Sequence, residues 1–110
     1  MAPAEAQVVS VATTVGSAAA ALALARRIID ERLGACVQIE DGVTSLYRWD
    51  GKLCQDSEVR LLVKTLPERI AALQALFDRE HPYELPQFLV TPAQASAAYA
   101  AWVRSEVGPG

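Results

Sequence analysis

The feature that most limits the possible folds of this chain is a pair of long strand-like segments that meet at Asp50-Gly51. Residues 35–49 and 52–65 flank this dipeptide, which is a strong signal for a two-residue hairpin turn. Strands of about 15 residues extend ~50 Å at ~3.3 Å per residue, whereas a compact domain of this size spans only ~35 Å. We therefore predict a hairpin that curls strongly or projects beyond the rest of the domain.

The hydrophobic pattern also determines how the two strands pair near their base. The later strand alternates between apolar residues and the charged residues Glu58, Arg60 and Lys64. A register continued straight from the turn would place Cys36 on the apolar face, so the first strand needs one extra residue to restore the pattern. Gly42 is the only glycine in that strand, and we predict a bulge between Glu40 and Val43. The repaired register sets Cys36 opposite Lys64, on the face away from the helices.

The segments before the hairpin predict a strand followed by a helix. Residues 7–13 are short and rich in valine, as is typical of a strand. Ser17 is a suitable N-cap for a helix over 18–33, and Gly34 stands where a C-cap is expected. The helix places these apolar residues at helical spacing: Leu22, Ala25, Ile29 and Leu33.

The segments after the hairpin predict a helix, a short strand and a last helix. Thr65 and Glu68 form a capping-box pattern, and a core-facing stripe follows at Ile70, Leu73, Leu76 and Phe77. Residues 85–91 predict the fourth strand, and Thr91 repeats the capping pattern before a helix that carries Tyr99 and Trp102. The order βαββαβ plus a terminal helix implies an α+β sandwich of ferredoxin-like type. We expect one domain over residues 7–107, preceded by a flexible tail over 1–6.

Composition excludes several classes of function. A net charge of −3 argues against nucleic acid or an anionic membrane as the main partner. The longest apolar run, 18–25, falls well short of the ~20 residues of a spanning helix. The first residues also lack the pattern of a signal peptide, so we expect a cytoplasmic protein. Hydrophobic residues make up 52% of the chain, slightly above the usual range, which favours burial of some apolar surface against another subunit.

Two motifs concentrate the aromatic and turn-forming residues of the chain: Ser45-Leu46-Tyr47-Arg48-Trp49-Asp50-Gly51 and His81-Pro82-Tyr83-Glu84-Leu85-Pro86. Together with Ala35-Cys36-Val37 and Lys64-Thr65 they closely resemble the CutA family of small trimeric proteins, which is named for divalent-cation tolerance. The resemblance runs from about Val8 to Val103. It implies a tightly packed homotrimer similar in architecture to the PII signalling proteins, with a role in tolerance of, or response to, divalent metal ions.

The candidate metal ligands are His81, the only imidazole in the chain, and its neighbours Glu80 and Glu84. The resemblance implies copper binding through a cysteine at the end of the first strand and histidines before the Pro-Tyr pair. Here Thr13 stands at the strand end and Glu80 precedes His81, so one of the three ligands is retained. Two cysteines and one histidine are also too few for a structural zinc site. We therefore expect weak binding of Cu²⁺ or another divalent metal.

Other residues are candidates for a small-molecule cleft or for a subunit interface, and the aromatic ones are Tyr47, Trp49, Tyr83 and Trp102. Glu58 lies two residues from Asp56, so these carboxylates either act as a pair or form a solvated or inter-subunit edge. An ammonium at Lys64 would favour the thiolate of Cys36, whereas the alternative is a small residue buried at an interface. The family pattern has asparagine and glutamate where this chain has Gln38 and Gln87.

Three hypotheses of function follow. The first is a non-enzymatic trimeric module that binds metal weakly or relays a signal. The second is a PII-like sensor that holds a small ligand in clefts between subunits. The third is an enzyme with Cys36 as nucleophile, and it is the weakest because no second base is identifiable beside this cysteine.

Overall fold

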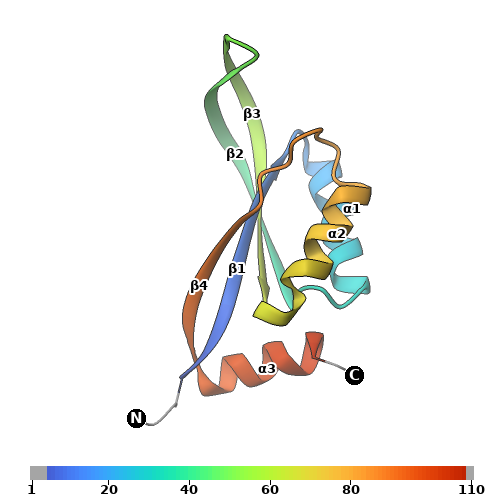
Figure 1. Cartoon of the computed structure of the whole chain (residues 1–110), viewed down its shortest axis with the longest axis vertical. Coiled ribbons are helices and arrows are strands. Elements are labelled where there is room, and N and C mark those ends of the chain that lie inside the picture. The colour runs from blue at the N-terminus through green and yellow to red at the C-terminus, as the bar shows by residue number, and fades with distance from the viewer. Residues whose placement is uncertain (1–4, 109–110) are drawn as a thin grey trace.

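The computed structural model describes residues 5–108, which form one antiparallel sheet with helices packed against it (Figure 1). The elements are, in chain order, β1 (Glu5–Val15), α1 (Ala18–Asp30), β2 (Cys36–Trp49), β3 (Lys52–Thr65), a 3₁₀ turn (Pro67–Arg69), α2 (Ile70–Glu80), β4 (Leu89–Ser96) and α3 (Ala97–Val107). The sheet order is β2-β3-β1-β4. The predicted α+β fold of ferredoxin-like type is therefore confirmed. Of the expected tail, residues 1–4 lie outside the described residues, and Glu5 already belongs to β1.

The main core lies between one face of the sheet and the helices α1 and α2. Alternate residues of the central strands β1 and β3 point into it and are almost fully buried: Val9, Val11, Val15, Val59, Leu61 and Val63. The predicted stripe of α2 is confirmed for Leu73, Leu76 and Phe77. A second cluster forms where α3 packs against the end of the sheet, around Val8, Leu66 and Val103.

The predicted inner face of α1 is partly wrong. Its buried residues are Ala21, Leu24, Ala25 and Ile28, whereas Leu22 and Ile29 are 45% and 43% exposed. The buried residues recur at helical spacing along one side of the helix, and Leu22 and Ile29 lie outside that side.

The two ends of α1 differ in how well they were predicted. Ser17 is the N-cap, and its side chain accepts a hydrogen bond from the amide of Ala20 at 3.1 Å. Gly34 is not the C-cap, because the helix ends at Asp30 and Arg32 takes the left-handed conformation at φ 56°. The Leu33 amide then bonds the Ile28 carbonyl at 2.9 Å, which closes the helix end.

Three predictions in the second half of the chain are also wrong. Thr65 is not an N-cap but the last, fully buried residue of β3. The fourth strand does not occupy 85–91, because β4 begins at Leu89 and includes Pro92. A proline is tolerated there because β4 is an edge strand, paired only with β1. The predicted cap Thr91 lies within β4, and the cap of α3 is instead Ser96, which accepts from the Tyr99 amide at 3.2 Å.

The hairpin of β2 and β3 matches its prediction closely. Asp50 and Gly51 form the turn with φ of 53° and 76°, both in the left-handed region. The register shifts between Glu40 and Val43, and Cys36 pairs with Lys64, as the bulge requires. The hairpin extends well past the helices (Figure 1), and the molecule measures 50 × 28 × 22 Å. No helix within residues 5–108 is both long and apolar enough to cross a membrane.

Candidate functional site

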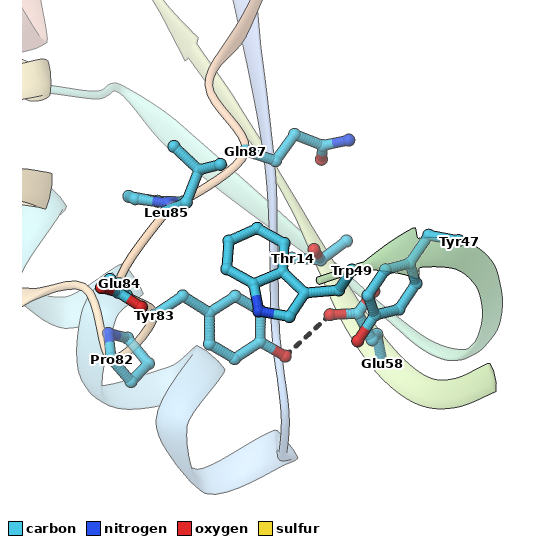
Figure 2. Close-up of a pocket in the computed structure, with 10 residues that line it drawn as sticks. Thr14, Tyr47, Trp49, Glu58, Pro82, Tyr83, Glu84, Leu85 and Gln87 are labelled. Atoms are coloured by element: carbon cyan, nitrogen blue, oxygen red, sulfur yellow. Dashed lines mark hydrogen bonds between the residues drawn. The ribbon is translucent and has the colours of Figure 1, made fainter. Parts of the chain in front are cut away.

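A cavity of about 720 Å³ lies between the hairpin and the loop that joins α2 to β4 (Figure 2). Figure 2 shows Tyr47 and Glu58 on the hairpin side and Pro82, Glu84 and Leu85 on the loop side, with Trp49 between them. The complete lining is Thr14, Tyr47, Trp49, Glu58, Pro82, Tyr83, Glu84, Leu85, Pro86 and Gln87. The structure therefore brings together four predicted cleft residues, Tyr47, Trp49, Glu58 and Tyr83, and one predicted metal ligand, Glu84.

Strand alternation explains why the hairpin residues share one side of the sheet. Val59 points into the core, so its neighbour Glu58 points to the face opposite α1 and α2. Cross-strand pairing of Tyr47 with Cys54 and of Trp49 with Lys52 puts both aromatic side chains on that same face. Two prolines in the segment 82–86 disfavour a regular element there, so the loop crosses the sheet end as irregular chain.

Tyrosine–carboxylate hydrogen bonds dominate the electrostatics of the cavity wall. The hydroxyl of Tyr83 donates to Oε2 of Glu58 at 2.7 Å, and Glu58 is only 9% exposed. Burial, together with the Glu58 carboxylate, raises the pKa of Tyr83 well above its usual value. The hydroxyl of Tyr47 donates to Asp56, and this bond raises the pKa of Tyr47 to about 12. Both phenols therefore remain protonated donors at neutral pH.

His81 lies just behind this wall and is held at both ring nitrogens. Its Nδ1 accepts a hydrogen bond from the Tyr83 amide at 3.1 Å, so the ring proton belongs on Nε2. Nε2 then donates to the Thr13 hydroxyl at 2.9 Å. Burial lowers the pKa of His81 below its usual value, which favours the neutral ring. The imidazole also contacts the rings of Phe77 and Tyr83, with centroids 5.4 and 5.3 Å away.

The three predicted metal ligands do not point to a common position. Glu80 forms an ion pair with Arg27 at 3.4 Å, and Glu84 lines the cavity. His81 is bound by neutral partners on both sides. Across residues 5–108, no group of three or more His, Cys, Asp or Glu side chains gathers in a metal-binding arrangement. The donor set that remains is one imidazole, with oxygen ligands that would have to rearrange.

The other predicted candidates lie away from the cavity. Cys36 is half-buried beside Lys64, whose ammonium donates to the Ser10 hydroxyl at 3.4 Å. Trp102 lies on α3, is 44% exposed and packs against the Tyr99 ring with a centroid distance of 5.7 Å. Cys36 does not line the cavity, so the cavity residues do not support the hypothesis that Cys36 is a nucleophile.

Sequence reasoning missed part of the lining, namely Thr14, Pro82, Leu85 and Pro86. Thr14 follows Thr13 on the opposite face of β1, so alternation alone would have placed it on the cavity side. The loop residues were harder to predict as lining. Two prolines restrict the backbone locally, but they do not show which element the loop packs against. Gln87 was noted for its difference from the family pattern, and it also lines the cavity.

Comparison with known proteins gives a consistent set of relatives. Residues 9–106 match the family model described as CutA1 divalent ion tolerance protein. The chain is 38% identical over 96 residues to the divalent-cation tolerance protein CutA of Thermus thermophilus, covering 86% of this chain and 93% of that protein. The structure of CutA from Synechococcus elongatus has a TM-score of 0.87 at 38% identity, with 94% and 92% of the two chains covered. CutA1 from Oryza sativa has a TM-score of 0.90 at 30% identity, with 97% and 99% covered.

Proposed function

The chain belongs to the CutA1 family of divalent ion tolerance proteins, and from this membership we propose that it acts in the response to divalent metal ions, copper among them. It does so as a non-enzymatic homotrimer in the cytoplasm. The relatives are named as tolerance proteins and not as enzymes. The exposed apolar side chains of the hairpin, Leu46 and Leu53 at 64% and 66% exposure, support its burial against neighbouring subunits.

His81 is the residue that we propose binds the metal, and it binds weakly. The observation that carries this proposal is the hydrogen bond between Nε2 of His81 and the hydroxyl of Thr13 at 2.9 Å. Thr13 of β1 thus lies beside the imidazole, but it offers a hydroxyl, which is a poor ligand for copper compared with a thiolate. A metal ion must also displace at least one of the two hydrogen bonds of the ring. Glu80 or Glu84 would complete the coordination after a change of rotamer.

Calorimetric titration with Cu²⁺ tests this assignment. His81→Ala should reduce the affinity by ~tenfold or more, because it removes the only imidazole. Thr13→Val is the matched control, because it keeps the imidazole and frees Nε2 from its neutral partner, so the affinity should stay the same or rise. Nanomolar binding by the wild type, or unchanged binding in His81→Ala, would contradict the proposal.

A second candidate function is supported by the cavity itself. A space of about 720 Å³ with three aromatic walls and few polar groups is typical of a small-molecule site. The hairpin that we propose lies between subunits supplies part of this lining, namely Tyr47, Trp49 and Glu58. We therefore propose, as the alternative, a PII-like sensor that holds a small ligand between subunits. Stabilisation of the protein by a small organic molecule in the absence of metal supports this alternative over the first.

A further inference from the structure

We infer that the cavity at the hairpin selects a small organic cation that carries an alkylammonium group. This inference rests on the second proposed function, that the cavity holds a small ligand, and it specifies the chemistry of that ligand. Three features support it: the charges of the lining, the environment of Glu58 and the aromatic walls.

The lining has a negative charge with no positive charge to balance it. Glu58 and Glu84 both line the cavity, and no lysine or arginine does so within the described chain. Two basic residues of β3 lie near the cavity without lining it: Arg60 is paired with Glu40 at 2.7 Å, and Lys52 is the cross-strand partner of Trp49. A phosphate or carboxylate ligand would therefore face repulsion, whereas a cation would be attracted.

Glu58 gives the more specific argument. A carboxylate that is 9% exposed normally has a positively charged partner, because burial without one is costly. Among residues 5–108 its hydrogen-bond partner is the neutral hydroxyl of Tyr83, and none of the ion pairs includes it. That bond uses only part of the acceptor capacity of a carboxylate. A cationic ligand would supply the missing charge.

The aromatic walls favour an alkylated ammonium group over a hydrated metal ion. The indole of Trp49 and the rings of Tyr47 and Tyr83 present electron-rich faces, which attract organic cations. Both phenols donate to carboxylates, and this increases the electron density of their rings. A divalent metal would instead need several oxygen or nitrogen ligands at one point, and no such group of side chains occurs in the described region.

Choline and its neutral isostere 3,3-dimethyl-1-butanol provide a direct test, because they have nearly the same shape and differ in charge. Binding is measured by calorimetry and by quenching of Trp49 fluorescence in a Trp102→Phe background, since these are the only two tryptophans. We expect choline to bind more tightly than the alcohol by roughly tenfold, as a desolvated cation–aromatic contact implies.

Glu58→Gln tests the role of the buried carboxylate. The amide oxygen still accepts from Tyr83, so the wall is retained while the charge is lost. The ratio of choline affinity to alcohol affinity should fall clearly, with the remainder due to the aromatic walls and Glu84. Glu68→Gln is the matched control, because it makes the same change in net charge at an exposed ion pair with Arg104. It should keep the full preference. If Glu58→Gln fails to fold, Glu84→Gln provides a second test, with a smaller reduction expected.

The outcomes separate this inference from the function on which it rests. If the alcohol, acetate or phosphate binds as tightly as choline, the cation inference is overturned while a small-ligand site remains. If none of these probes binds, the cation inference is overturned. The sensor function is overturned only if a thermal-shift screen of small organic molecules without metal also finds no stabilisation, and the metal proposal at His81 is unaffected. An unchanged choline preference in both Glu58→Gln and Glu84→Gln also overturns the inference.

Discussion

At the scale of single residues, His81 connects the central strand β1 to the cavity loop. Its Nε2 bonds Thr13 of β1, and its Nδ1 accepts from the amide of Tyr83, which in turn bonds Glu58. Three consecutive hydrogen bonds thus join residues that are far apart in the sequence. The position of the cavity wall therefore depends on the neutral form of one imidazole.

The stability of the protein should fall as the pH drops below about 6.5 because of His81. Burial lowers the pKa of this imidazole in the folded state, so the unfolded chain binds the proton more readily. The stabilisation is complete above the unfolded pKa of about 6.5 and is lost as the pH falls below it. Thermal unfolding of wild type and His81→Asn as a function of pH checks this. Because His81 is the only histidine, an equally steep fall of the melting temperature with pH in the variant would refute this prediction.

The residue scale is also where sequence reasoning was least complete. The sequence identified His81 as a candidate ligand, but the partners of its two nitrogens come from β1 and from the loop, and no local pattern encodes such contacts. Thr65 shows the same limit in another form. Its spacing to Glu68 predicts a helix N-cap, yet the residue is the last one of β3. Its buried hydroxyl has no hydrogen-bond partner in the described structure. Burial within the sheet overrode the local preference.

At the scale of secondary-structure elements, the hairpin bulge sets which side chains reach the cavity. The shift between Glu40 and Val43 lets the base of the hairpin keep its apolar face on the core. Gly42 adopts φ of 74° at this point, and a Cβ there would meet no atom within 4 Å. The need for glycine at this position is therefore conformational and not a matter of space.

Gly42→Ala should destabilise the protein by about 1–2 kcal/mol, the usual cost of a left-handed residue with a Cβ. Gly42→Asn should cost less, because asparagine tolerates this conformation better. Denaturant unfolding at a fixed protein concentration measures both. If both variants lost the same large amount of unfolding free energy, a steric clash would be indicated, contrary to the open space around this position.

The elements that sequence reasoning located well are those with strong local signals. The Asp50-Gly51 turn, the bulge near Gly42 and the apolar stripe of α2 were all correctly predicted. The boundary of β4 was not, because Pro92 argues against a strand unless the strand is known to lie at an edge. Edge position is a property of the assembled sheet, and it is not visible within the segment itself.

At the scale of the whole molecule, the hairpin extends beyond the helices and exposes apolar side chains on both faces. Tyr47 and Trp49 lie on the cavity face, whereas Leu46 and Leu53 lie on the other. An isolated ribbon of this kind is only marginally stable. Association of several copies would cover it, in agreement with the homotrimer that we propose.

Leu53→Asp should weaken this assembly, because it would place an unpaired charge in the proposed interface. Leu22→Asp is the matched control: it changes a leucine of 45% exposure on α1 instead of one on the hairpin, and should leave assembly intact. Light scattering over a range of concentrations measures both. A wild type that remains a monomer of 11.8 kDa at micromolar concentration would contradict the trimer.

The position of β1 in the sheet also affects how the fold is completed during synthesis. β1 is made first, yet it lies between β3 and β4, and Val9 pairs with Thr65 on one side and Pro92 on the other. The β2–β3 hairpin needs only local contacts and can form while the ribosome is still extending the chain. The first strand can pair with β3 on one side, but its other edge stays open until residues 89–96 have emerged. We therefore expect a nascent chain stopped before β4 to be a good substrate for chaperones, and the docking of β4 to be the late step of folding.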